Sequence, residues 1–387
     1  MKDPISQKLK SIPISIFSKM TNLANQYNAI NLSQGFPDFP MPDFIKEEAY
    51  KAIKEDKNQY APSIGIPELR EGLSKKYKDF YNLDYDPNKE ITVLTGATEA
   101  ITSVLLGLHN PGDEIIIFEP FYDAYIAVCQ FNGIIQKTIP LDYPKFTINE
   151  SLLEKAFSSK TKSILINTPN NPTTRVFTEE ELRLIGNMAE KYNTYIITDE
   201  VYEHITFDNN HIPIATFSDI RDRVITISSF AKTFSVTGWK IGYALASESV
   251  SKSIRLSHQF ITFCSATPLQ YALAEALKID RSFYNNLQNE YRERRDILYK
   301  GLVNAGFKTF PTEGTYYIVA DITPFGFSDD IKFCEFLIRD IGIAAIPMSE
   351  FYSKEHKRRN LVRFCFCKKI ENLKKANERL QKLKEYI

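Results

Sequence analysis

The sequence predicts an α/β protein built on a mainly parallel sheet. From about residue 90, short apolar runs alternate with helical patterns such as 97–110, 121–133 and 179–193. The apolar runs are residues 91–95, 114–118, 163–167, 194–198, 224–228 and 241–246. Strands that are apolar throughout and are separated by helices are typical of a parallel sheet covered on both faces.

A change in the sequence pattern after residue 280 predicts a larger and a smaller domain. After residue 280 a charged helical pattern, 281–306, is followed by short strands and a terminal amphipathic helix. We expect a large domain over residues 44–280 and a small α+β domain over residues 281–387. An N-terminal arm, residues 1–43, is expected to pack with the small domain.

Composition excludes several classes of partner. Lys plus Arg and Asp plus Glu both number 48, so no overall charge favours nucleic acid or an anionic membrane. No signal-peptide-like run is seen at the start, and no uncharged stretch approaches the ~20 residues needed to cross a bilayer. The five cysteines lack the spacing of zinc ligands, so we expect reduced thiols, no metal and a cytoplasmic protein.

Polar residues follow several predicted strands, at the point where each strand ends. Residues 95–98 follow the first run, Asn167 ends the third, Asp199 follows the fourth, and Ser229 and Lys232 follow the fifth. Ligands of open α/β sheets bind outside the carboxyl ends of the strands. The sequence therefore predicts one binding site formed by these strand ends.

The turn Gly96-Ala97-Thr98 precedes a helix, so its backbone N–H groups could hold a phosphate. The alternative is a tight turn in which Thr98 caps the helix. No Walker or GxGxxG pattern occurs, which argues against a nucleoside triphosphate or a dinucleotide as the ligand.

Lys232 lies three residues after Ser229, a spacing shared with serine acyl-enzymes. The other elements of such enzymes, K-T-G and S-D-N, are missing. A buried lysine is costly unless it is paired or used covalently, and a Schiff base with pyridoxal phosphate would use it. The carboxylate that holds the protonated ring nitrogen of this cofactor would be Asp199, unless Asp199 only caps a helix.

Nine segments resemble the fold-type-I, class I/II aminotransferases, and the nearest members are methionine and kynurenine aminotransferases. In order, they are INLSQGFPDF (30–39), NQYAPSIGIPELR (58–70), TGATEA (95–100), EPFYDAY (119–125), NTPNNPTT (167–174), TDEVYEHITF (198–207), SSFAKTFSVTGWKIGY (228–243), EGTYYIVAD (313–321) and VRFCF (362–366). The resemblance covers nearly the whole chain and implies a seven-stranded large domain that binds pyridoxal phosphate.

The resemblance implies a role for each cofactor residue. Lys232 would form the Schiff base and act as general acid and base, and Asp199 would pair with the ring nitrogen. The phosphate would be held by the backbone of Ala97 and Thr98, by Ser229 and Lys240, and by Tyr60 of the neighbouring subunit, which implies a homodimer with shared sites. Tyr122 would stack on the ring, unless it is an ordinary core aromatic, and Asn171 and Tyr202 would donate to the phenolic oxygen.

On the substrate side, the resemblance implies that Arg363 grips the α-carboxylate and that the backbone at Gly35 approaches it. The alternative for Arg363 is an internal salt bridge. Four apolar residues lie in segments that line the substrate side in similar enzymes, or could equally be core: Ile16, Phe17, Phe36 and Phe263. One departure is Thr174, where the family often has glycine.

The implied activity is a ping-pong transfer of an amino group from an apolar amino acid to a 2-oxo acid. Methionine is the favoured donor, and aromatic amino acids or kynurenine are also compatible. The stretch 258–264 offers no arginine for a second carboxylate, which disfavours aspartate. A carbon–sulfur β-lyase on the same fold and a non-catalytic cofactor-binding protein are the alternatives.

Overall fold

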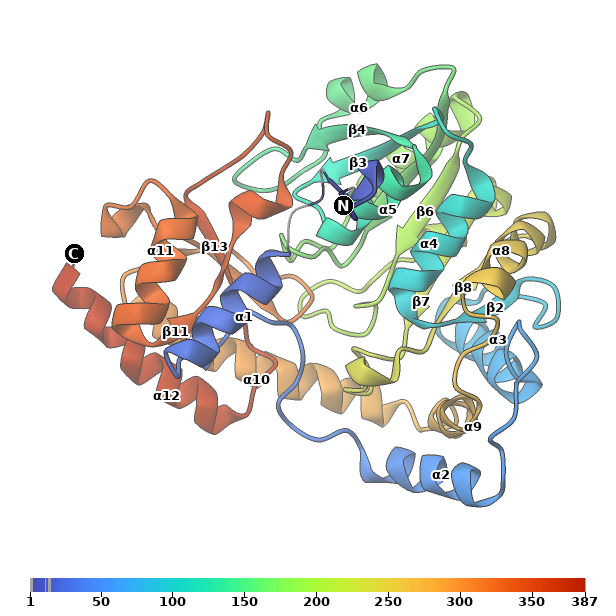
Figure 1. Ribbon diagram of the computed structural model, residues 1–387, viewed down its shortest axis with the longest axis horizontal. Coiled ribbons are helices and arrows are strands. Elements are labelled where there is room, and N and C mark those ends of the chain that lie inside the picture. The colour runs from blue at the N-terminus through green and yellow to red at the C-terminus, as the bar shows by residue number, and fades with distance from the viewer. Residues whose placement is uncertain (1–2, 11, 13–14, 387) are drawn as a thin grey trace.

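The computed structural model describes residues 3–10, 12 and 15–386. Figure 1 shows a large twisted sheet with its helices beside a second group of elements made by the C-terminal part of the chain. The large sheet contains β2 (Ile91–Leu94), β3 (Glu114–Glu119), β4 (Ile135–Pro140), β5 (Thr161–Asn167), β6 (Tyr195–Asp199), β7 (Val224–Ser229) and β8 (Gly242–Leu245).

The seven strands lie in the order β2-β8-β7-β6-β5-β3-β4. All are parallel except β8, which runs antiparallel to both β2 and β7. Parallel neighbours need a crossover connection, usually a helix. Residues 230–241, which join β7 to β8, form only a short 3₁₀ turn at Thr237–Trp239, and β8 accordingly returns beside β7.

All six apolar runs form strands, and the mainly parallel sheet that the sequence predicts is confirmed. The seventh strand, β4, gave no apolar signal because its side chains are mostly exposed or half-buried at one edge of the sheet, whereas β2 at the other edge is buried throughout. An edge strand needs no continuous apolar run, since one side and much of one face meet water.

Helices cover both faces of the sheet. The helices of this part of the molecule are α2 (Asp43–Lys54), α3 (Pro67–Tyr81), α4 (Gly96–Leu108), α5 (Asp123–Asn132), α6 (Glu150–Ala156), α7 (Glu179–Lys191), α8 (Glu248–Ile261) and α9 (Thr267–Ala276). Helix α2 lies away from the sheet and packs against α9 (Figure 1). On β3, Ile115 and Ile117 belong to the core layer that also contains residues of α4, α5 and α8, whereas Ile116 belongs to the larger layer on the other face. Alternate side chains of one strand thus fill two cores, which explains the continuous apolar runs.

The C-terminal group contains a four-stranded sheet in the order β12-β13-β10-β9. Its elements are α10 (Ser282–Asn304), β9 (Lys308–Thr309), β10 (Tyr317–Asp321), α11 (Asp330–Phe336), β11 (Ile343–Ala344), β12 (Ile346–Pro347), β13 (Leu361–Cys365) and α12 (Ile370–Leu380). Strand β13 pairs antiparallel with β10 and β12, and this pairing places Arg363 opposite Val319 and Ile346.

The N-terminal segment makes contacts with both parts of the molecule. Helix α1 (Ile16–Gln26) contacts β11 and β12, and β1 (Ile30–Asn31) pairs in parallel with β11. Figure 1 shows α1 in blue beside the orange and red C-terminal elements. The short 3₁₀ turn at Gln7–Leu9 instead contacts α5 beside the large sheet.

Across the described ranges, no helix is both long enough and apolar enough to span a membrane.

Candidate active site

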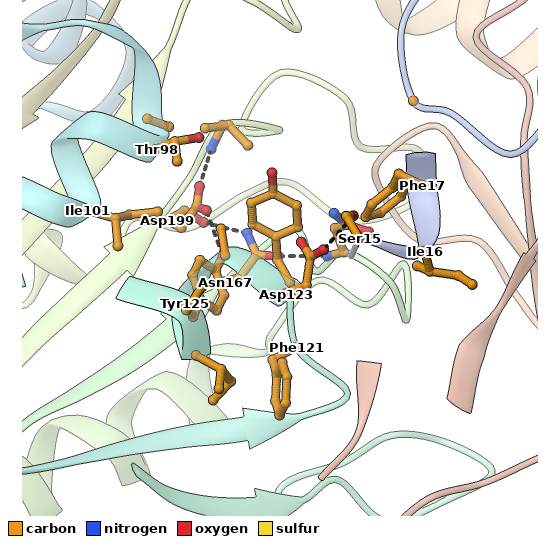
Figure 2. Close-up of a pocket in the computed structure, with 18 of the residues that line it drawn as sticks. Ser15, Ile16, Phe17, Thr98, Ile101, Phe121, Asp123, Tyr125, Asn167 and Asp199 are labelled. Carbon is orange, nitrogen blue, oxygen red and sulfur yellow. Dashed lines mark hydrogen bonds between the residues drawn. The ribbon is translucent and has the colours of Figure 1, made fainter. Parts of the chain in front are cut away.

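The polar strand ends meet at one cavity of about 1020 Å³, as the sequence predicts. Figure 2 shows part of its wall, with Thr98, Asp199 and Asn167 from strand ends and Ser15, Ile16 and Phe17 from the N-terminal segment. The predicted site residues that line it are Phe17, Gly35, Ala97, Thr98, Tyr122, Asn171, Asp199, Tyr202, Ser229, Lys232 and Lys240.

The ammonium group of Lys232 has few polar neighbours. Its Nζ donates a 3.2 Å hydrogen bond to the carbonyl oxygen of Gly35. It also lies 5.6 Å from the ring centroid of Tyr202 and 5.4 Å from that of Tyr316. Burial lowers the pKa of Lys232 from its usual range, and the positive charge of Arg363 acts in the same direction. A lysine with a lowered pKa supplies the neutral amine that nucleophilic attack on an aldehyde requires.

Asp199 is a buried carboxylate at the end of β6. Its Oδ2 accepts a 2.6 Å hydrogen bond from the hydroxyl of Tyr125, and its Oδ1 accepts one of 3.3 Å from the backbone N–H of Val201. Burial raises the pKa of Asp199 to about 6, although these hydrogen bonds and the charge of Lys232 oppose the rise. The helix-cap alternative is wrong, because residues 201–204 form turns and not a helix.

An anion site is formed where β2 passes into α4. Helix α4 begins at Gly96, so Ala97 and Thr98 lie in its first turn, where backbone N–H groups have no partner within the helix. Thr98 is not the cap; that position belongs to Thr95, which makes no capping hydrogen bond through its side chain. Ser229, the last residue of β7, lines the same part of the cavity.

Lys240 reaches this helix terminus because two glycines leave room for it. A Cβ atom on Gly96 would lie 3.3 Å from Nζ of Lys240, and one on Gly242 would lie 2.8 Å from the backbone nitrogen of Ala97. A helix N-terminus, a hydroxyl and an ammonium group therefore converge on one space. This donor set fits a phosphate dianion.

Tyrosines form the wall around Lys232. The hydroxyl of Tyr202 lies 3.1 Å from that of Tyr317, and the ring of Tyr202 packs edge-on against Tyr316, 5.2 Å between centroids. Tyr122 packs edge-on against Tyr125 at 5.6 Å, and burial raises the pKa of Tyr122 to about 12. Tyr122 lines the cavity and also packs against the core layer that contains Ile115 and Ile117.

Arg363 is fully buried and lies directly behind two cavity residues, Asn171 and Tyr317. Its Nη1 donates to Oδ1 of Asn171, its Nη2 donates to the carbonyl oxygen of Ser33 at 3.3 Å, and its guanidinium carbon lies 3.8 Å from the ring centroid of Tyr317. Its Nε has no hydrogen-bond partner.

No carboxylate among the described residues forms a salt bridge with Arg363, so the internal salt-bridge alternative is wrong. A buried guanidinium that lacks a counter-ion and has a free donor is suited to a ligand carboxylate. Arg363 itself is not among the residues that line the cavity, but it contacts two of them, Asn171 and Tyr317.

Gly35 allows a close approach of the chain to the tyrosine wall. A Cβ atom at this position would lie 2.0 Å from the hydroxyl oxygen of Tyr317. The carbonyl oxygen of Gly35 accepts hydrogen bonds from Tyr316 at 2.6 Å and from Lys232. The apolar residues Ile16, Phe17 and Phe36 also line the cavity on this side.

Besides Arg363, two predicted residues lie outside the cavity, Tyr60 and Phe263. Tyr60 is 83% exposed and packs edge-on against Phe263, 5.3 Å between ring centroids. Phe263 is itself 46% exposed, so it is neither core nor a wall of this cavity. An exposed aromatic pair of this kind is available for contact with another molecule.

Sequence reasoning gave no role to several residues of the site. They are Ser15, Asp123, Tyr125, Tyr316 and Tyr317. Figure 2 shows Ser15 and Asp123 joined at one wall, where the Ser15 hydroxyl donates to Oδ2 of Asp123 at 2.9 Å. The spacing of Tyr122 and Tyr125, three apart on a predicted helix, was a usable signal, because such residues share one helix face.

The comparisons with known proteins agree with this geometry. Residues 27–380 match the family model described as aminotransferase class I and II. The chain is 38% identical to the methionine aminotransferase of Escherichia coli over 97% of both chains. It is 37% identical to kynurenine–oxoglutarate transaminase 3 of Rattus norvegicus, over 96% of this chain and 89% of that protein. The solved structure of N-succinyldiaminopimelate aminotransferase from Mycobacterium tuberculosis superposes with a TM-score of 0.95 at 39% identity, covering 98% of this chain and 100% of that one.

The chain belongs to the class I and II aminotransferase family and has the fold-type-I architecture. It is a transaminase of the pyridoxal-phosphate-dependent class. The residues present suit that cofactor: a helix-terminus anion site, a buried carboxylate and a lysine of lowered pKa line one cavity. A fully buried arginine with a free Nε contacts two of the residues that line it, Asn171 and Tyr317.

Proposed function

We propose that this protein transfers the amino group of an apolar amino acid, with methionine favoured and aromatic amino acids or kynurenine as further donors, to a 2-oxo acid. The observation that carries the donor class is the substrate-side wall, which combines Ile16, Phe17, Phe36 and Phe121. The described residues that line the cavity include no arginine. A donor with a second carboxylate would lack the bidentate partner that such a group prefers.

Each residue has a defined task in this proposal. Ala97, Thr98, Ser229 and Lys240 hold the phosphate, and Tyr122 stacks on the ring. Asp199 keeps the ring nitrogen protonated, while Asn171 and Tyr202 donate to the phenolic oxygen. Pyridoxal phosphate, when bound, supplies the electron sink that stabilises negative charge at the substrate Cα.

Lys232 moves the proton. Its amine, whose pKa is lowered by burial, would take the proton from Cα and return it to the other side of the transferred nitrogen. Arg363 and the backbone at Gly35 orient the α-carboxylate, so that the Cα–H bond faces Nζ. The oxo acid product leaves before the second substrate enters, which gives ping-pong kinetics.

The proposal also includes the assembly and the domains. A homodimer with shared sites would give the exposed Tyr60 a function, because its hydroxyl would reach the phosphate in the partner's cavity. Residues 1–43, 44–280 and 281–387 act as arm, large domain and small domain, with the arm helix α1 placing Ile16 and Phe17 on the substrate side. The proposal includes a cytoplasmic location, in which the free cysteines would stay reduced.

The test uses the purified protein loaded with pyridoxal phosphate. Methionine should change the visible absorbance of the bound cofactor, and a 2-oxo acid should restore it, with parallel double-reciprocal plots in steady state. Lys232→Ala should abolish the exchange while the cofactor still binds through its phosphate. Full activity of Lys232→Ala would contradict the proposal, and formation of pyruvate and ammonia from cystathionine would identify a β-lyase instead.

A further inference from the structure

A buried carboxylate outside the cavity accepts four hydrogen bonds. Oε1 of Glu203 accepts from Nζ of Lys76 at 2.6 Å, from the hydroxyl of Ser228 at 3.0 Å and from that of Tyr243 at 3.2 Å. Its Oε2 accepts from the hydroxyl of Tyr81 at 2.7 Å. Neither Glu203 nor Lys76 lines the cavity, so neither would contact a bound ligand directly.

The pair stays ionised in spite of its burial. Burial opposes ionisation of Glu203, but the charge of Lys76 and the hydrogen bonds outweigh it and hold the pKa of this carboxyl well below its usual range. Burial likewise opposes the charge on Lys76, and the carboxylate of Glu203 raises the pKa of Lys76 above its usual range. The neighbouring His204, 3.8 Å from Oε2, has its pKa lowered by burial and is neutral near pH 7.

The four donors come from three elements, α3, β7 and β8, whereas Glu203 belongs to the turn that follows β6. Within this turn, the N–H of Glu203 donates to the carbonyl oxygen of Glu200 at 3.0 Å, and that of Ile205 donates to Tyr202 at 2.8 Å. The carboxylate therefore fastens one short, non-helical turn to three rigid elements. That turn carries Asp199 at its start and Tyr202 immediately before Glu203.

The same carboxylate also restrains the phosphate side of the cavity. Ser228, which donates to Glu203, immediately precedes Ser229 on β7. The Ser228 hydroxyl also lies 3.4 Å from the carbonyl oxygen of Glu200. A shift of Glu203 would thus change the positions of both Tyr202 and Ser229.

We propose that Glu203, held by Lys76, is a positioning residue that fixes Tyr202 beside Lys232 and Ser229 beside the anion site. The inference rests on the proposed function, in which Tyr202 donates to the phenolic oxygen of the cofactor. A buried ion pair is weak evidence for stability, because well-packed apolar residues often serve as well. Geometric control of a turn that carries two site residues is a separate reason for its presence.

The test compares Glu203→Gln with Asp330→Asn. Asp330 is also a fully buried carboxylate, and it accepts from the backbone N–H and hydroxyl of Ser349 at 2.7 and 2.8 Å, in the C-terminal group of elements. Both variants are expected to lower Tm. Only Glu203→Gln should speed hydrogen exchange of the amides in residues 199–205, and only it should move the pH midpoint of the absorbance of bound pyridoxal phosphate.

In steady state, Glu203→Gln should lower kcat by about 100-fold with little change in KM, the loss that a misplacement of about 1 Å can cause. Tyr81→Phe, which removes only one donor to Glu203, should shift the same pH midpoint in the same direction but by less. This variant tests the inference if Glu203→Gln does not fold. An unchanged pH midpoint and unchanged exchange at 199–205, at a Tm loss equal to that of Asp330→Asn, would overturn the inference. A wild-type protein that does not transaminate would instead overturn the proposed function.

Discussion

The hydroxyl of Tyr125 donates a 2.6 Å hydrogen bond to Oδ2 of Asp199, in a part of the core where both side chains are buried. Burial raises the pKa of Asp199 to about 6, and the hydrogen bond from Tyr125 is the strongest influence in the opposite direction. A donor to a carboxylate favours its ionised form. Tyr125, on α5, therefore tunes a charge carried by β6.

The first prediction concerns Tyr125→Phe. Affinity for pyridoxal phosphate should rise with pH as Asp199 ionises through about pH 6, because only the carboxylate pairs with a protonated ring nitrogen. Without the Tyr125 hydroxyl, the midpoint should move upward by about one to two pH units, the size of a hydrogen bond to a charged group. Quenching of the fluorescence of Trp239, the single tryptophan and a neighbour of Lys240, measures the binding.

Tyr195→Phe is the matched control, since Tyr195 lies on the same strand as Asp199 and packs against the same core layer. Its binding midpoint should equal that of the wild type. Equal midpoints for all three proteins would show that Tyr125 does not tune Asp199.

A second prediction follows for Asp199 in the cofactor-free protein. Its folded-state pKa of about 6 exceeds the usual value of 3.8, so the folded protein binds more protons than the unfolded chain between these values. The protonated form of Asp199 therefore contributes to the free energy of unfolding in full below about pH 4, and this contribution is lost as the pH rises to about 6. Asp199→Asn should remove this loss and raise the free energy of unfolding at pH 7 by roughly 2–3 kcal/mol.

Denaturant unfolding of the cofactor-free proteins at pH 4 and pH 7 measures the effect. The difference between variant and wild type should be larger at pH 7. An equal difference at both pH values would mean that the titration of Asp199 has no part in it.

A third prediction separates the phosphate from the rest of the cofactor. Lys240→Ala should weaken binding of pyridoxal phosphate by about 10- to 100-fold, since a hydrogen bond to a charged group is worth about 1.5–3 kcal/mol. Binding of pyridoxal, which lacks the phosphate, should not change. The control is Lys252→Ala, which removes an exposed lysine of α8 that pairs with Glu248. A similar loss for both ligands would mean that Lys240 acts elsewhere than on the phosphate.

A fourth prediction concerns Arg363→Lys. The guanidinium stacks on Tyr317 and bonds to Asn171, and a lysine would keep the charge but lose the planar fork. We expect KM for the amino acid to rise by about 10- to 100-fold, with a smaller change in affinity for the cofactor. Arg359→Lys, two residues before β13 and paired with Asp329, is the control. An unchanged KM would remove Arg363 from carboxylate binding.

The strand pattern predicted the fold well because the sheet is covered on both faces. Runs such as 114–118 and 224–228 are mainly apolar and are buried at every position, and ligands of such sheets bind at the carboxyl ends of the strands. Asn167, Asp199 and Ser229 could be placed in one site on this basis alone. The edge strand β4 was missed because its side chains meet water, so it carries no continuous apolar run.

Contacts between distant segments could not be predicted in the same way. Glu203 and Lys76 are 127 residues apart, and Tyr125 and Asp199 are 74 apart. No local sequence pattern indicates that such distant side chains are in contact. The alternatives for Thr98 and Asp199 as helix caps failed for a related reason, since a cap depends on where the helix actually begins.

The last prediction concerns Thr174, where the family often has glycine. The residue is buried and has a φ of +69°, in the left-handed region that β-branched residues avoid. This conformation costs an L-residue roughly 1–2 kcal/mol, whereas glycine adopts it freely but costs about 0.5–1 kcal/mol in chain entropy. The backbone of Thr174 bonds to Asn170 and Gly314 at 2.8 Å each, so the turn itself is held by the main chain.

Thr174→Gly should therefore leave stability unchanged or raise it by up to about 1 kcal/mol, measured as Tm of the loaded protein. Thr173→Gly is the matched control. Thr173 has no positive φ, and its hydroxyl donates to Oδ1 of Asn170 at 2.7 Å. Glycine would keep the N–H that bonds to the same oxygen but would lose the hydroxyl bond and add chain entropy, so stability should fall by about 1–2 kcal/mol. An equal fall in Tm for both variants would show that the left-handed turn at Thr174 carries no strain, and that the threonine is held there by its packing and by its 3.3 Å hydrogen bond to the carbonyl oxygen of Pro311.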